Sequence, residues 1–185
     1  MAEIKECYIN FVGEVNQNTV NQLIQIINEK LKQGINQFVL LISSPGGYVA
    51  PGISGYNFLK GIPAEVITHN YGSADSIAVV LFCAGSRRYC TPNGRFLLHG
   101  IGFNAPQGMR FEEKQLDERI KSMRIDRENI SKIIAENCKK KPEEIEQDLF
   151  EVKVLNPDEA KNYGLVHEVK TQLFPKGAEV INILQ

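Results

Sequence analysis

The sequence has no tryptophan, only three histidines, and four cysteines of which none lies in a Cys-x-x-Cys pair. Widely spaced cysteines argue against a disulfide framework or a zinc ribbon and favour a reducing compartment. No apolar run approaches the roughly 20 residues of a membrane-spanning helix, and residues 1–10 lack the apolar core of a signal peptide. We therefore expect a cytoplasmic protein with no membrane partner.

An excess of charge of either sign is also lacking, since the formal net charge is −1. This balance predicts no general attraction to nucleic acid or to anionic lipid. Histidine and carboxylate spacings typical of metal sites are missing, and Gly46-Gly47 is not followed by the Lys-Ser/Thr of a phosphate-binding loop. The sequence thus predicts no metal, no cofactor and no nucleic-acid partner.

What is present suits one α/β domain covering residues 1–185, because 185 residues with 43% hydrophobic content can bury one sizeable core. Short apolar segments predict strands at 7–12, 38–42, 64–68, 96–98 and 165–169. Helical spacing or helix signals predict helices at about 19–31 (capped by Asn18 or Thr19), 48–59, 77–84, 111–137 and 142–150, and from Pro157 to Gly164. Such alternation is typical of a largely parallel sheet, which gathers ligands at the carboxyl ends of its strands.

The stretch 69–85 draws most attention, because a polar turn runs straight into the apolar segment 77–84. We expect a helix buried on all sides there, with a continuous strand as the competing interpretation. Ser76 begins this segment with the small residues Ala74 and Ala78 on either side, which favours a sharp strand-to-helix turn that projects the hydroxyl as a nucleophile. Free amides at the helix start would then face a developing oxyanion. The commoner use of such a serine is as a helix N-cap, and both interpretations stay open.

A general base is predicted at His99, which directly follows the apolar strand 96–98 and is therefore held by a rigid element. His69 ends the expected strand just before the Ser76 turn, and His167 lies in the terminal segment Gly-Leu-Val-His-Glu-Val. Each histidine alone is more often structural, but Ser76 and His99 both fall at strand ends, where a site would form.

The long charged segment 111–137 predicts one amphipathic helix that exceeds the usual globular length. Two interpretations stay open for it, a subunit contact and a solvated surface helix. Its apolar positions are Leu116, Ile120, Met123, Ile130, Ile133 and Ile134.

Four motifs in register resemble the proteolytic subunit of the Clp protease family from about Phe11 to Val169. They are Ser43-Ser44-Pro45-Gly46-Gly47, Gly72-x-Ala74-x-Ser76, Arg88-Tyr89-x-x-Pro92-Asn93-x-Arg95-x-x-x-His99 and Glu159-Ala160-x-x-Tyr163-Gly164-Leu165-Val166. Each motif is modest by itself, and the four together are specific.

The resemblance implies the ClpP/crotonase-like fold, a spiral of β-β-α units with a protruding long handle helix. It implies Ser76 as nucleophile, His99 as general base, and the backbone amides of Gly47 and Ile77 as the oxyanion hole. It further implies that residues 100–137 form the handle that joins two rings into a homo-oligomer. Substrate peptides or unfolded polypeptides would bind as an added strand.

The chain departs from the family pattern at three places. Val152 occupies the position of the family's catalytic aspartate, and Asp75 stands before the serine where a small residue is usual. The chain also enters its first expected strand almost at once, whereas the family's N-terminal segment helps to dock a hexameric ATPase. We therefore do not expect stimulation by a Clp-type ATPase, and we expect a Ser76–His99 pair without a conventional acid, with Asp148, Glu151 or Asp75 as rival third members.

Three functional hypotheses follow. A ClpP-like serine endopeptidase, slow or independent of an ATPase, is favoured. A non-catalytic structural or regulatory relative is the second, because of Val152. A crotonase-type acyl-CoA enzyme shares the fold but lacks support, since no acyl-CoA signature is evident. Covalent capture of Ser76 by a fluorophosphonate separates the first hypothesis from the others.

Overall fold

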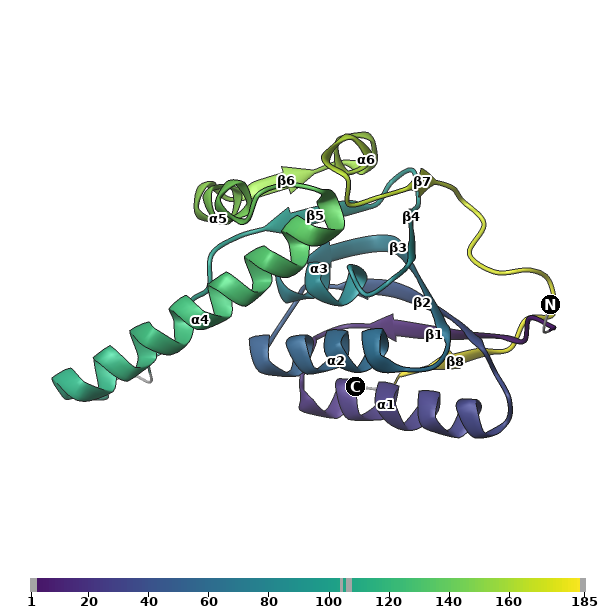
Figure 1. The fold of residues 1–185 in the computed structure, drawn as a ribbon, viewed down its shortest axis with the longest axis horizontal. Helices are drawn as coiled ribbons and strands as arrows, with labels where there is room; N and C mark the ends of the chain where they lie inside the picture. The colour runs from purple at the N-terminus through teal and green to yellow at the C-terminus, as the bar shows by residue number, and fades with distance from the viewer. Residues whose placement is uncertain (1–2, 104, 106–107, 184–185) are drawn as a thin grey trace.

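A computed structural model describes residues 3–103, 105 and 108–183 (Figure 1). The strands are β1 Glu6–Val12, β2 Gln37–Ser44, β3 Glu65–Asp75, β4 Arg87–Cys90, β5 Arg95–Leu98, β6 Lys153–Leu155, β7 Glu168–Val169 and β8 Val180–Asn182. The helices are α1 Gln17–Lys32, α2 Val49–Gly61, α3 Ile77–Phe82, α4 Glu113–Cys138, α5 Pro142–Glu151 and α6 Pro157–Tyr163.

The strands form a single sheet with the path β6-β5-β3-β2-β1-β8, from which β4 branches to pair with β3 and β7. Every pairing in the described part of the chain is parallel except β5 with β6. The long strand β3 pairs first with β4 through Ile67–Asn70 and then with β5 through Ser73–Asp75. This change of neighbour brings the end of β5 beside the end of β3, where the site residues lie.

Alternation along the central strands divides the core into two faces, as the two-residue period of a strand requires. Ile9, Phe11, Leu40 and Ile42 belong to the main core with the helices, whereas Tyr8, Val39, Leu41 and Ile67 form a smaller cluster of their own. Figure 1 shows α1 and α2 lying along one side of the strands. All four cysteines are buried and free, and burial raises the pKa of each thiol.

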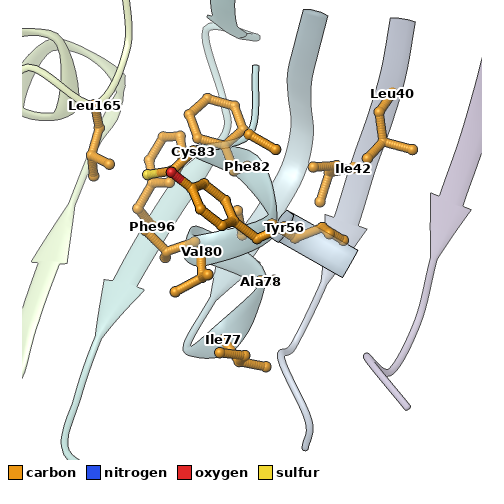
Figure 2. Packing of buried hydrophobic residues seen from close by; sticks show 14 of the residues in the cluster. Leu40, Ile42, Tyr56, Ile77, Ala78, Val80, Phe82, Cys83, Phe96 and Leu165 are labelled. Carbon is orange, nitrogen blue, oxygen red and sulfur yellow. The ribbon is translucent and has the colours of Figure 1, made fainter. Parts of the chain in front are cut away.

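Helix α3 lies in the centre of the main core, and all its residues are buried. Figure 2 shows its side chains among Tyr56 of α2, Phe96 of β5 and Ile42 of β2. The rings of Phe82 and Phe96 meet edge-on with centroids 5.0 Å apart. The prediction of a helix buried on all sides is confirmed, although α3 ends at Phe82 rather than at Ala84.

The predicted α/β class with a mostly parallel sheet is confirmed, and several element boundaries need correction. Asn16 caps α1 in place of Asn18 or Thr19, because Asn16 accepts from the Thr19 amide while the Thr19 hydroxyl accepts from the Asn16 amide. Strand β3 continues past the predicted Thr68 to Asp75, and the last predicted strand shrinks to β7. Strands β4, β6 and β8 were not predicted, since short edge strands carry little periodic signal.

Helix α4 extends away from the rest of the molecule (Figure 1). Its buried residues all lie in its last third, from Ile130 to Cys138, whereas Leu116, Ile120 and Ile125 are exposed. The predicted handle 100–137 includes Asn104, Pro106 and Gln107, which lie outside the described residues. The long predicted helix itself is confirmed.

Candidate active site

Ser76 joins the end of β3 to the start of α3 in a strained conformation, with φ 58° and ψ −128°. A non-glycine residue with positive φ is uncommon and needs support from its surroundings. Part of that support is the Ser76 amide, which donates to the carbonyl of Leu97 on β5 at 2.7 Å. The side chain is half-buried and makes no capping bond to α3, so it does not act as a helix cap.

The glycine-rich loop after β2 lies directly against this serine. A Cβ on Gly46 would lie 2.7 Å from both the Ser76 Cβ and the Asp75 carbonyl oxygen, and 3.4 Å from the Ser76 Oγ. Gly47, with φ 150°, would likewise bring a Cβ within 2.3 Å of the Val15 carbonyl oxygen. Only glycine permits these approaches, which explains the paired glycines at this loop.

Backbone bonds hold the loop in place. The Val15 amide donates to the Gly46 carbonyl at 2.7 Å, and the Tyr48 amide donates to the Val15 carbonyl at 2.8 Å. On the other side Gly52 of α2 packs on Ile77, since a Cβ there would lie 2.2 Å from Ile77 Cγ1. Among the described residues, the amides of Gly47 and Ile77 make no backbone hydrogen bond outside the regular elements, which leaves them free to donate to a ligand.

Asp75 precedes the serine but turns away from it. Its side chain is 6% exposed, and Oδ2 accepts from the Arg95 Nη2 at 2.7 Å. The second oxygen, Oδ1, is buried without a partner among the described residues. The negative charge of Asp75 is therefore paired with Arg95 and makes no contact with His99.

His99 follows β5 and is half-buried, with its Nδ1 2.7 Å from the Gly100 carbonyl oxygen. In the part of the chain that the structure describes, the Ser76 hydroxyl makes no hydrogen bond to His99. The two other histidines sit apart from the serine. His69 Nε2 lies 3.2 Å from the Lys170 carbonyl oxygen, and His167 Nδ1 accepts from the Arg88 amide at 3.0 Å.

The position of the family's acid is adjacent to His99 through a strand pairing that the sequence analysis missed. Strands β5 and β6 pair antiparallel, and their last pair is Leu98 with Lys153, so His99 and Val152 both lie next to the end of this pairing. Val152 has φ 61° and ψ 93° and is 55% exposed. Its isopropyl group has no atom that can accept the histidine proton.

The rival acids are engaged elsewhere. Asp148 on α5 is buried and accepts from the Tyr163 hydroxyl at 2.5 Å and from the Lys153 ammonium. Glu151 accepts from the Gln147 side-chain amide. Glu151 is the last residue of α5, one residue beyond the predicted helix 142–150.

A groove of about 520 Å³ opens beside His99 between α4 and α5. Gly100 and Ile101 form its wall nearest the histidine. The opposite wall is formed by residues of α4 and α5, with Ile120, Met123, Leu149 and Phe150 among them. Phe150 is 83% exposed, which is unusual for a phenylalanine of a folded chain.

Among the described residues, no group of three or more His, Cys, Asp or Glu side chains is arranged to hold a metal ion. None of the helices in this part of the chain is both long and apolar enough to cross a bilayer.

Comparison with family models gives a match to the model described as Clp protease over residues 2–172. This range includes the whole of the site described above and almost all of the 185-residue chain. The mixed α/β architecture with its mostly parallel sheet agrees with that assignment. The chain belongs to the Clp protease family.

Proposed function

We propose that this chain is a ClpP-like serine endopeptidase that cleaves peptides or unfolded polypeptides through an acyl-enzyme on Ser76. The observation that carries the proposal is the strained turn at Ser76, with φ 58° and a hydroxyl that caps nothing. Backbone strain of roughly 1–3 kcal/mol persists only where the surroundings enforce it. Here β5, Gly46 and α3 together enforce it, and a structural serine would gain nothing from that cost.

In the proposed reaction His99 is the general base. The proton of the Ser76 hydroxyl passes to Nε2 of His99 as Oγ attacks the scissile carbonyl carbon. His99 then gives the same proton to the departing amine nitrogen, which leaves an ester on Ser76. A water molecule, deprotonated by His99 in the same way, hydrolyses the ester and restores the serine.

The amides of Gly47 and Ile77 would stabilise the oxyanion of each tetrahedral intermediate. Support comes from their position on either side of Ser76, with Gly46 packed on the serine and Ile77 next to it in the chain. Two fixed backbone donors at such a site typically contribute about 2.7–4 kcal/mol each. No metal or cofactor takes part in this mechanism.

The substrate chain would enter along the groove beside His99. Gly100 and Ile101 are outside regular secondary structure, so their backbone is open to pair with an extended peptide. Apolar groups of the groove, including Met123 and Leu149, favour apolar substrate side chains. This mode of binding suits unfolded polypeptides better than folded proteins.

A fluorophosphonate probe tests the proposal. Mass spectrometry of the intact protein should show one adduct, and peptide mapping should place it on Ser76. The adduct should be lost in Ser76→Ala and kept in the matched control Ser54→Ala. Ser54 lies on α2, and its hydroxyl donates to the Ala50 carbonyl. No adduct on the wild-type chain would favour the non-catalytic alternative, which Val152 and the unformed Ser76–His99 bond also suggest.

We also propose that α4 lies in a subunit interface of a homo-oligomeric ring. Members of the family form rings, and the exposed part of α4 carries Leu116, Ile120 and Ile125, which are 40%, 46% and 50% exposed. Covering apolar surface gains about 25 cal/mol per Å². Sedimentation velocity at micromolar concentration should show a large assembly, and a monomer there would contradict the proposal.

A further inference from the structure

The position that holds an acid in the family cannot orient His99 in this chain. The last pair of the β5–β6 register is Leu98 with Lys153, and His99 and Val152 are the residues next to that pair. Neither Asp148 nor Glu151 is available, because each accepts a hydrogen bond within its own surroundings. A neutral imidazole still needs its proton on Nδ1 if Nε2 is to act as a base, so another acceptor has to fix the tautomer.

The structure offers one such acceptor, the carbonyl oxygen of Gly100, at 2.7 Å from Nδ1 of His99. A carbonyl oxygen only accepts, so the hydrogen atom of this bond belongs to Nδ1. The neutral ring then keeps its lone pair on Nε2, which is the nitrogen that has to take the serine proton. The backbone therefore sets the tautomer that the proposed reaction requires.

The two other histidines carry their proton on the opposite nitrogen. Nε2 of His69 faces the Lys170 carbonyl, so Nε2 holds the hydrogen atom there. Nδ1 of His167 accepts from the Arg88 amide, which again leaves the hydrogen atom on Nε2. Burial lowers the pKa of both side chains, so both are neutral near pH 7. His99 is thus distinct among the three histidines of the chain.

The backbone at Val152 adds a second, independent observation. Val152 has φ 61° and ψ 93°, a positive-φ conformation that a β-branched residue rarely adopts. The backbone at the acid position is thus strained for the valine that occupies it, and a residue that is not branched at Cβ relieves part of that strain.

We infer that the Gly100 carbonyl replaces the triad acid as the positioning group for His99, so that Ser76, His99 and a backbone oxygen form the working site. This inference rests on the proposed peptidase function. When Nε2 takes the serine proton, Nδ1–H stays bonded to Gly100, and a neutral carbonyl stabilises the imidazolium less than a carboxylate. The enzyme is therefore slow in its present form and can be accelerated by restoring the acid.

The tautomer is measured directly by nitrogen NMR of the full chain labelled with 15N-histidine, in solution or by magic-angle spinning if the particle is large. At pH 7.5 one histidine should show a protonated Nδ1 and an unprotonated Nε2, and the other two the reverse. The first signal should vanish in His99→Gln. A protonated Nε2 on His99 would overturn the inference, whether or not the protein is an active peptidase.

The kinetic test compares Val152→Asp with Val152→Asn. Both variants relieve the strain of a valine at positive φ and should raise the melting temperature alike, but only the aspartate supplies a carboxylate. Fluorophosphonate labelling of Ser76 should be at least about tenfold faster in Val152→Asp than in Val152→Asn, within the roughly 10⁴-fold effect of a triad acid. Equal rates in the two variants would overturn the inference. Absence of labelling in every variant would instead overturn the proposed function, and the NMR experiment would still decide the tautomer.

Discussion

The two sides of the site are built very differently. On the serine side, Ser76 lies between β3, β5 and α3, where Gly46 approaches so closely that no side chain fits. On the acid side, Val152 follows the end of α5 and is 55% exposed. A substitution at Ser76 or Gly46 is therefore expected to disturb the core, whereas one at the exposed Val152 is expected to leave the packing of the core intact. If the proposed roles hold, the acid position tolerates substitution more readily than the serine turn does.

The largest expected effect is a loss of turnover when Ser76 or His99 is replaced. Ser76→Ala and His99→Ala should each reduce peptide hydrolysis by several orders of magnitude, and the double variant should be no worse than either, because nucleophile and base act as one unit. Steady-state hydrolysis of a fluorogenic peptide measures this. If the losses of turnover in the two single variants multiplied in the double variant, the two residues would act independently. That result would contradict the proposed Ser76–His99 pair.

The next largest effect is expected on the free energy of unfolding, from the packing of Gly46 against Ser76. It is measured by comparing Gly46→Ala with Gly34→Ala. Both glycines have positive φ, 94° and 84°, but Gly34 has no atom within 4 Å of an added Cβ. Gly34→Ala should cost only the backbone term of about 1–2 kcal/mol. Gly46→Ala should lose a further amount of about 1–3 kcal/mol through overpacking, together with its turnover. Urea unfolding of both variants checks this, and equal losses would show that the loop is not packed on Ser76 as described.

On the acid side, Asp148→Asn and Glu151→Gln should separate stability from catalysis. Asp148→Asn weakens the bonds to Tyr163 and Lys153, so the free energy of unfolding should fall by about 1–3 kcal/mol. Glu151→Gln should change little, since this side chain is exposed. Turnover per folded molecule should stay at the wild-type value in both. A loss near the roughly 10⁴-fold of a disabled triad acid would identify that residue as the third member instead.

The effect that is smallest at neutral pH concerns His69, on β3 ahead of the serine. Burial, with a smaller contribution from the charge of Lys170, lowers its pKa to about 4. The unfolded chain takes up a proton below about pH 6.5 while the folded chain does not, so stability is fully present above that pH and falls as the pH drops toward 4. The loss approaches about 1.4 kcal/mol per pH unit.

Urea unfolding at pH 7, 6 and 5 measures that dependence. His69→Gln should flatten the dependence of unfolding free energy on pH more than His167→Gln does. The reason is that His69 is buried whereas His167 is exposed. Identical slopes for wild type and His69→Gln would show that His69 takes up its proton in the folded state as readily as in the unfolded one. The serine side would then be less tightly closed to water than the packing indicates.

Local patterns in the sequence were enough to predict the elements next to the serine. The run 77–84 predicted a buried helix because eight consecutive apolar residues need apolar neighbours on every side. The apolar strand 96–98 predicted that His99, which directly follows it, is held in place by a rigid element. The resemblance to the Clp protease family added the roles of Ser76, His99, Gly47 and Ile77, which stay proposals.

Only the tertiary structure decided what surrounds those residues. The sequence placed Val152 at the acid position, and the β5–β6 pairing ends next to both Val152 and His99, because strand register joins residues more than 50 positions apart. The positive φ of Ser76 and of Val152 depends on long-range packing that propensity does not encode. The bond from His99 to the Gly100 carbonyl likewise depends on how β5 ends, since a backbone oxygen leaves no mark in the sequence. Residue identity determined which groups were present, and the fold determined which of them could meet.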